Sequence, residues 1–303
     1  SEIWAVAFVG DSQVVIGCAD GGIRRWKIED KQQQGPTIQL GDDFRSLAVS
    51  NDGRWIVSGN RGKKATVWNG VTHKRACEFA GYDGPVTAVD ISGDCTKAVA
   101  GCYGTTGTAR IFGITSGAEL LPDSPVSHRN IRGVKFSPDG SRFATVSDDL
   151  SFRVYSTRDG QVLFDSGTRY SSETLDMVTP LAWSADGQQL FIATRGKITC
   201  FNISKSSSSD WSIHESLARV SIASNGIFIA CSAGRSISLW DCMSHERIGT
   251  ITHTAHINCI ALSSCGGYLA CGRGKNIMIH NLRDDLPSKY FVSNVSEHPR
   301  HAM

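Results

Sequence analysis

Short segments with alternating apolar and polar residues recur along the whole chain. A six-residue pattern, apolar at its first, fourth and sixth positions, occurs seven times: IWAVAF, FRSLAV, VTAVDI, IRGVKF, VTPLAW, LARVSI and INCIAL, beginning at residues 3, 44, 86, 131, 178, 217 and 257. Alternation with a period of two is typical of β-strands. No sustained helical periodicity accompanies it, so the pattern predicts an all-β protein.

Two further strands follow each of these segments. A turn rich in Asp, Asn, Ser and Gly comes first, and such residues tolerate turn geometry at low cost. A second apolar strand follows, as in RWIVSG (54–59) and RFATVS (142–147). After another short turn, a third strand ends in an aromatic residue or His: IRRW, ATVW, ARIF, FRVY, ITCF, ISLW and IMIH. The variable segment after it has room for a fourth, outer strand.

The seven units are 39 to 47 residues apart and fill almost the whole chain. A sheet of this size cannot bury both faces alone, whereas radial stacking covers both faces and ring closure leaves only short edges. We therefore expect a single domain over residues 1–296 and a flexible tail over 297–303. We expect residues 288–296 to form the outer strand of the last unit, with no N-terminal strand inserted there.

At this point the sequence resembles the WD-repeat family. FSPDG (136–140) and SLWD (238–241) are its most similar pieces. The resemblance implies a seven-bladed WD40-type β-propeller with four antiparallel strands per blade. The family's turn Asp corresponds to Asp20 and Asp149. Its Gly-His pair has counterparts only at Gly81-Tyr82 and Thr252-His253. We therefore expect no blade to contain the family's full Asp–His–Ser/Thr–Trp network.

Two stretches are similar to a narrower group, the C-terminal propellers of fungal NACHT-type signalling proteins. They are SADGQQLFIATRGKITCFNI and FIACSAGRSISLWD. This resemblance implies a sensor or partner-binding module that follows a nucleotide-binding domain. The chain begins Ser1-Glu2-Ile3 without a Met and inside an apolar pattern. We expect either that the initiator Met was removed or, in preference, that this is a domain taken from a longer protein.

Composition adds few constraints. The net charge is +2, hydrophobic residues are 40% and charged residues 20%, which favours a soluble globular domain. No apolar run reaches the length of a membrane span and no leader opens the chain, so we expect no membrane partner. The ten cysteines form no C-x-x-C pair. We interpret them as small buried residues in a reducing, cytoplasmic environment.

The basic turns are the one feature that indicates a site. Arg-Gly-Lys occurs at 61–63, 195–197 and 273–275, each time between a second and a third strand. The resemblance implies that these turns share one face. The predicted partner-binding residues are Arg61, Lys63, Lys64, Arg195, Lys197, Arg235, Arg273 and Lys275. Converging cations suit an acidic protein or peptide partner. The opposite face carries Asp11, Asp52, Asp94, Asp139 and Asp186, which we interpret as turn residues.

No catalytic set, cofactor motif or metal-ligand spacing stands out. We therefore predict a non-enzymatic interaction scaffold. A lectin-like binder using Trp4, Trp55 or Trp211 and a nucleic-acid binder using the basic face remain alternatives. Trp26, Trp68, Trp183 and Trp240 fit core positions. Two polar stretches, 165–177 and 204–211, are predicted to be mobile connections, although the second could simply link strands.

Overall fold

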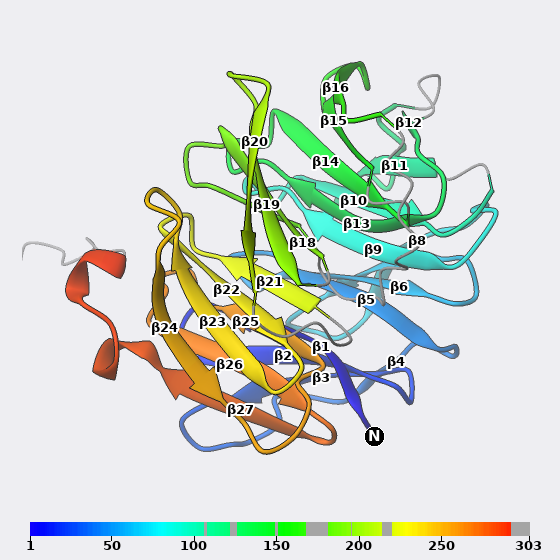
Figure 1. Cartoon of the computed structure of the whole chain (residues 1–303). Coiled ribbons are helices and arrows are strands. Elements are labelled where there is room, and N and C mark those ends of the chain that lie inside the picture. The colour runs from blue at the N-terminus through cyan, green and yellow to red at the C-terminus, as the bar shows by residue number, and fades with distance from the viewer. Residues whose placement is uncertain are drawn as a thin grey trace, which may run out of the picture.

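A computed structural model describes residues 1–105, 108–121, 126–148, 151–167, 181–194, 196–213 and 220–291. It contains seven antiparallel sheets that follow one another in chain order around a ring (Figure 1). The chain is thus an all-β, seven-bladed propeller, as predicted. In the part that the structure describes, no helix is long and apolar enough to span a bilayer.

The first two strands of each blade follow the predicted positions closely. The innermost strands are β1 (Ile3–Val9), β5 (Phe44–Val49), β9 (Val86–Ile91), β13 (Ile131–Phe136), β17 (Leu181–Trp183), β21 (Val220–Ser224) and β25 (Cys259–Leu262). The second strands are β2 (Gln13–Cys18), β6 (Trp55–Asn60), β10 (Lys97–Cys102), β14 (Arg142–Ser147), β18 (Gln189–Thr194), β22 (Phe228–Ala233) and β26 (Tyr268–Arg273).

The third strands are equally regular, and the outer strands vary. The third strands are β3 (Gly22–Lys27), β7 (Ala65–Asn69), β11 (Thr108–Gly113), β15 (Phe152–Ser156), β19 (Lys197–Asn202), β23 (Ser236–Asp241) and β27 (Asn276–Asn281). The outer strands are β4 (Ile38–Gln39), β8 (Arg75–Phe79), β12 (Val126–Ser127), β16 (Val162–Asp165), β20 (Ser207–Ser212) and β24 (Arg247–Thr252). In the described residues, the seventh blade has three strands.

The chain after β27 turns away from the edge of the seventh blade. It forms two short 3-10 helices, η1 (Leu282–Asp284) and η2 (Ser288–Tyr290), instead of starting the strand predicted over 288–296. Tyr290 explains the difference, because its ring is buried and packs edge-on against Phe228 with centroids 6.1 Å apart. Residues 292–296 and the predicted tail lie outside the described residues.

Apolar side chains between neighbouring blades form the core. Seven clusters of described residues each join two adjacent blades. One of them closes the ring, because it contains Ile3 of the first blade and Cys259 of the seventh. The Ile3 amide donates to the Gly274 carbonyl at 2.7 Å, and Asn258 Nδ2 donates to the Ile3 carbonyl at 3.1 Å. β1 remains the innermost strand of its own blade, so the expectation of no inserted N-terminal strand is confirmed.

Four of the turns between first and second strands, in the second to fifth blades, share one hydrogen-bonding motif. Ser137 Oγ donates to Asp139 Oδ1 at 2.6 Å and accepts from the Arg142 amide at 3.0 Å, while Asp139 also accepts from the Ser141 amide. Ser50, Ser92 and Ser184 repeat the arrangement with the Asp two residues later. Asp52, Asp94, Asp139 and Asp186 are therefore turn-stabilising groups, in agreement with the sequence interpretation. Asp11 does not form the motif, and its buried Oδ1 has no hydrogen-bond partner in the described structure.

One blade contains a polar network that the sequence analysis missed. His128 is buried, with Nδ1 at 2.7 Å from Thr145 Oγ1 and Nε2 at 2.8 Å from Ser151 Oγ. The expectation that only Tyr82 and His253 occupy this position was therefore wrong. Ser127 rather than Gly precedes His128, so a search for a Gly-His pair passes over it.

The expectation that 204–211 is a mobile connection was also wrong. Ser207–Ser212 forms β20, which pairs with β19 along its whole length. An outer strand has one neighbour and exposes most of its side chains, so its sequence needs no apolar alternation. The other stretch, 165–177, lies outside the described residues from residue 168 on.

Ring closure predicts the first mutational result. Ile3→Ala removes a side chain that is 2% exposed and packed between the first and last blades. We expect the free energy of unfolding in urea to fall by about 2–5 kcal/mol. Val71→Ala, at a position 70% exposed, is the matched control and is expected to change it by less than about 0.5 kcal/mol. Equal effects of the two substitutions would contradict the role of Ile3 in closure.

The serine–aspartate turns predict a pH dependence. Hydrogen bonds from the Ser137 and Ser141 hydroxyls lower the pKa of Asp139 from 3.8 to about 2. Because the folded-state pKa lies below the unfolded one, the stabilisation is present above about pH 4 and is lost as the pH falls through about 2. We expect wild type to exceed Asp139→Asn in unfolding free energy at neutral pH, with the margin shrinking over this window. A margin that stays constant with pH would rule this out.

Candidate partner-binding surface

The predicted basic residues that the structure describes all lie at or beside turns between second and third strands. Each turn contacts the segment that enters a first strand: the Arg61 amide donates to the Asp43 carbonyl, and the His253 amide to the Arg235 carbonyl. The common connectivity of the blades places these turns on one face of the ring. Arg195 lies outside the described residues.

The Arg-Gly-Lys triplets do not occupy equivalent positions in their turns. Thr194 pairs with Lys197, so Gly196 is the second residue of a two-residue turn, with φ at +79°. Arg273 pairs with Asn276, so Gly274 is the first turn residue, with φ at +55°. In a hairpin, a shift of one residue reverses the direction of a side chain. The shared triplet therefore does not present its cations in a shared orientation.

Several of the predicted cations are paired with carboxylates. Arg61 lies 3.4 Å from Asp43, Lys64 lies 2.8 Å from Glu78, and Lys197 lies 2.9 Å from Asp210. Exposed pairs of this kind contribute only about 0–1 kcal/mol each, but they lower the local positive charge. Arg273 instead donates to Thr254 Oγ1 at 3.0 Å. Lys63, Arg235 and Lys275 are exposed.

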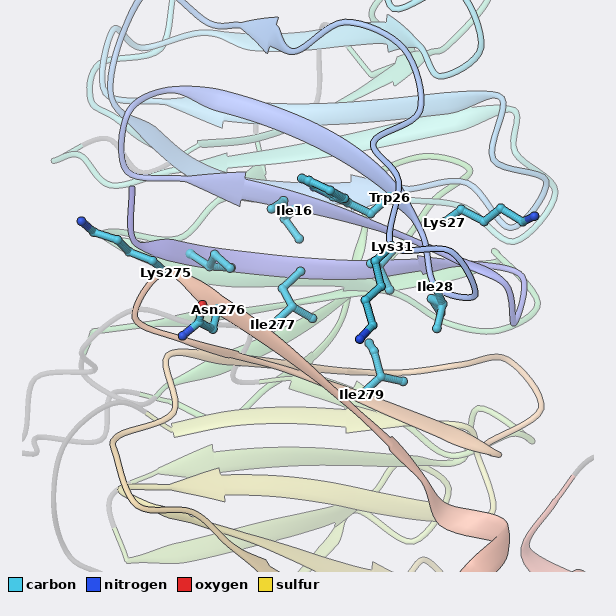
Figure 2. Close-up of a pocket in the computed structure, with 11 residues that line it drawn as sticks. Ile16, Trp26, Lys27, Ile28, Lys31, Lys275, Asn276, Ile277 and Ile279 are labelled. Carbon is cyan, nitrogen blue, oxygen red and sulfur yellow. The ribbon is translucent and has the colours of Figure 1, made fainter.

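A groove lies between the first and last blades. Its volume is about 490 Å³. The lining residues are Ile3, Val14, Ile16, Trp26, Lys27, Ile28, Lys31, Lys275, Asn276, Ile277 and Ile279. Figure 2 shows Ile277 and Ile279 on β27 facing the strands and loop of the first blade. The groove is therefore apolar inside, with lysines around it.

Two of these lysines are available to a ligand. Lys27 is paired with Glu29 at 3.2 Å. Lys31 and Lys275 form no ion pair within the part of the chain that the structure describes. Lys275 also belongs to the predicted basic set, so that set and the groove meet at this residue.

The groove borders a strand with one open edge. β27 pairs with β26 on one side, and no strand among the described residues pairs with its other side. Its residues are half-buried or exposed. An open strand edge presents unpaired backbone N–H and C=O groups, which are ready to pair with another extended segment.

The tryptophans fit this picture only in part. Trp183 and Trp240 are buried, as predicted, while Trp26 and Trp68 are half-buried. The indole N–H of Trp26 is buried without a hydrogen-bond partner in the described structure. Trp26 is therefore a groove residue as well as a core residue.

The three tryptophans proposed for a lectin-like site are dispersed. Trp4, Trp55 and Trp211 each pack against a different apolar cluster. Trp211 also stacks on His245, with ring centroids 4.5 Å apart. These contacts support packing over sugar stacking.

The cysteines lie where the alignment of repeats predicts. Cys18, Cys102, Cys231 and Cys271 are all buried. However, the structure brings Cys271 together with His253 and His280, a group that the sequence analysis did not find. Their separations of 18 and 9 residues match no familiar metal-binding spacing. Only the alignment of second and third strands could have revealed the group.

Comparison with known proteins agrees with the repeat architecture. Residues 38–69, 124–156 and 246–281 match the family described as WD domain, G-beta repeat. The three matches fall on the second, fourth and seventh blades, in agreement with the resemblance seen in the sequence.

Similar proteins come from animals and plants. Human apoptotic protease-activating factor 1 is 26% identical over 66% of this chain and 16% of its own length. The potato guanine nucleotide-binding protein subunit beta is 27% identical over 48% of this chain and 39% of its own. The rice small ribosomal subunit protein RACK1y is 29% identical over 49% and 44%. The chain therefore spans less than half the length of these relatives.

Proposed function

We propose that this propeller is a non-enzymatic interaction module that binds an extended segment of a protein partner between its first and last blades. The observation that carries the proposal is the open edge of β27 beside an apolar groove with unpaired lysines. Two of the relatives are, by their names, components of larger assemblies, which supports a role in protein–protein association.

The backbone of the bound segment would supply the outer strand that the seventh blade lacks among the described residues. Six blades carry a fourth strand in this position, so the seventh offers a place of the same geometry. A segment paired with β27 gains main-chain hydrogen bonds, and pockets for alternate side chains add specificity. Ile277 and Ile279 face the groove, so apolar residues at alternate positions of the segment would pack there.

The positive charges at the groove add a second requirement for the bound segment. Lys31 and Lys275 at the groove favour acidic residues beside the apolar ones. The proposed ligand is therefore an extended segment with alternating apolar residues and acidic side chains next to them.

The wider set of basic turns would guide this partner to the groove. Exposed cations raise the rate at which an acidic partner meets the protein. The residues with this proposed role are Arg61, Lys63, Lys64, Arg195, Lys197, Arg235 and Arg273. Lys275 alone would also contact the bound segment.

We also propose a setting for the module: the sensing end of a fungal NACHT-type signalling protein in the cytoplasm. The human relative supports a long parent protein, since the matched region is 16% of its length. All ten cysteines are free of disulfides, which supports a reducing compartment. An upstream nucleotide-binding domain in the full transcript and a cytoplasmic fluorescent fusion are the expected results. Finding neither would remove this setting without affecting the groove.

The groove proposal is tested with displayed peptides that alternate apolar and acidic residues. Ile279→Asp places a charge in the groove, and Lys31→Glu with Lys275→Glu reverses its lysines. We expect each variant to weaken the selected peptides at least about tenfold, which corresponds to about 1.4 kcal/mol. Lys205→Glu, at an exposed position in another blade, is the matched control and should bind as wild type does. Affinity is measured by calorimetry.

Backbone pairing has a separate readout. N-methylation of alternate peptide residues should abolish binding in one register and leave it in the other, because only every second amide faces β27. Equal tolerance in both registers, or selected peptides that bind Ile279→Asp normally, would contradict the proposal. A variant ending at residue 291 that gains affinity would show that the chain's own C-terminal residues occupy the groove instead.

The guiding role of the basic turns predicts a kinetic difference. Replacing Arg61, Lys63, Arg235 and Arg273 by Ser should lower the association rate and its salt dependence while leaving the dissociation rate unchanged. Ile279→Asp should mainly raise the dissociation rate. Surface plasmon resonance at two salt concentrations separates these effects. Unchanged association at low salt would remove the basic face from the site, and tight binding of unrelated nucleic acid would favour that alternative.

A further inference from the structure

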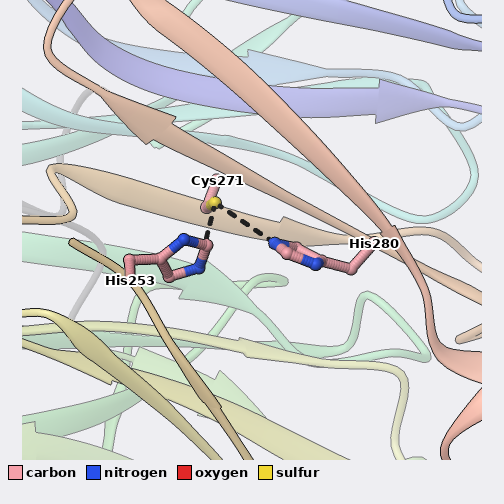
Figure 3. Close-up of side chains that lie close together, drawn as sticks. All are labelled: His253, Cys271 and His280. Atoms are coloured by element: carbon pink, nitrogen blue, oxygen red, sulfur yellow. Dashed lines mark hydrogen bonds between the residues drawn. The ribbon is translucent and has the colours of Figure 1, made fainter. Parts of the chain in front are cut away.

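Three metal-ligating side chains meet between the sixth and seventh blades. Cys271 Sγ lies 3.8 Å from His253 Nε2 and 3.9 Å from His280 Nε2 (Figure 3). All their candidate ligand atoms lie within 4.8 Å of one another. His253 and Cys271 are buried and His280 is half-buried. The group is thus compact, with one side near the open edge of β27.

The fourth blade shows what this position contains when it serves only as a hydrogen-bonding network. Thr145 is the fourth residue of β14, as Cys271 is of β26. Thr145 bonds His128 there, at 2.7 Å. In the seventh blade a sulfur replaces the hydroxyl, and His280 stands where the fourth blade has Tyr155. A thiol is a weaker hydrogen-bonding partner than a hydroxyl, and a sulfur with a second imidazole is a better ligand set for a transition metal.

The spacing suits a zinc ion. Zinc–sulfur bonds of about 2.3 Å and zinc–nitrogen bonds of about 2.0–2.1 Å in a tetrahedron place the sulfur about 3.6 Å from each nitrogen. The two observed sulfur–nitrogen distances, 3.8 and 3.9 Å, exceed this value by a few tenths of an ångström. Small rotations of the side chains can close this difference. Zinc sites with three protein ligands commonly complete the tetrahedron with water.

The electrostatic surroundings are compatible with this ligand set. Burial lowers the pKa of both His253 and His280, so their imidazoles are neutral and offer lone pairs at pH 7. Burial raises the pKa of Cys271 to about 11, so an ion must displace the thiol proton. The charged groups that act on the three residues are Arg273, near Cys271 and His253, and Asp285, near His280.

We propose that His253, Cys271 and His280 bind a zinc ion, with water as the fourth ligand. The ion would join the connection after β24 to β26 and to the edge strand β27. It would therefore hold the last blade against the sixth at the point where no outer strand supports β27 in the described structure. This site shares no residue with the proposed peptide groove, since Ile277 and Ile279 face the opposite side of β27.

Cobalt(II) titration of the tag-free, chelator-treated chain tests the site. We expect a single ion per chain, the absorption bands of a tetrahedral ion, a thiolate-to-cobalt charge-transfer band and displacement by zinc. Release of about one proton per ion into a weakly buffered solution at pH 7.5 should accompany binding. Cys271→Ser should lose the charge-transfer band and weaken zinc at least about 100-fold.

Two matched controls keep the result specific. Cys259→Ser removes a buried thiol on the side of the same blade that faces the first blade, and should leave the bands unchanged. The double variant His298→Gln with His301→Gln excludes the histidines near the C-terminus. If Cys271→Ser does not fold, His280→Phe, which restores an aromatic residue, should fold and lose the stabilisation by zinc.

Three outcomes would overturn the proposal. They are no binding at micromolar zinc, a charge-transfer band that survives Cys271→Ser, and zinc stabilisation that His280→Phe retains. Selective binding of copper without zinc would replace the zinc assignment with a copper one. In the first case the group is a thiol–imidazole hydrogen-bonding network only.

Discussion

Mutual burial of sheet faces is the constraint on which the rest of this structure depends. Each blade is a small sheet with two apolar faces, and each face is covered only by a neighbouring blade. The first blade therefore needs the last one, and the ring must close. Closure rests on Ile3, which packs between these blades and accepts and donates hydrogen bonds across the seam. A linear stack of the same units would leave two apolar faces in water.

The seam is also where the repeat is least regular, and this explains why both proposed sites involve the last blade. Alternation along β27 sends Ile277 and Ile279 to the groove, and Met278 and His280 to the sixth blade. A single strand, without an outer neighbour among the described residues, thus carries one side of a peptide groove and one ligand of a candidate metal site. Fixing β27 from one side reduces its freedom on the other, so a bound ion would pre-organise the edge that a peptide must pair with.

The sequence predicted the fold well because burial on both faces imposes a strict pattern. β5, β9 and β13 begin at the predicted residues 44, 86 and 131, and every third strand contains its predicted segment. Outer strands were harder to locate. β20 is rich in serine, because an exposed outer strand does not need alternating apolar residues. Likewise, the terminal segment could not be placed from its pattern, because Tyr290 packs in an apolar cluster with residues distant in the sequence, such as Phe228.

Only one part of the candidate site was predictable from the sequence, namely the part that follows from the order of the strands in each blade. Connectivity alone puts the basic turns on one face, but whether each cation is free depends on partners such as Glu78 and Asp210 on outer strands. The groove and the Cys–His group depend on side chains that converge from separate strands and blades, and no local motif encodes such convergence. The sequence does show where the last unit differs from the others. His280 stands where the other six third strands have Trp, Phe or Tyr, and Cys271 stands where the second and fourth blades have the hydroxyl residues Ser58 and Thr145. The other six blades maintain the ring. The last blade can therefore differ in sequence from the others and take on a specific binding role at little cost to the fold.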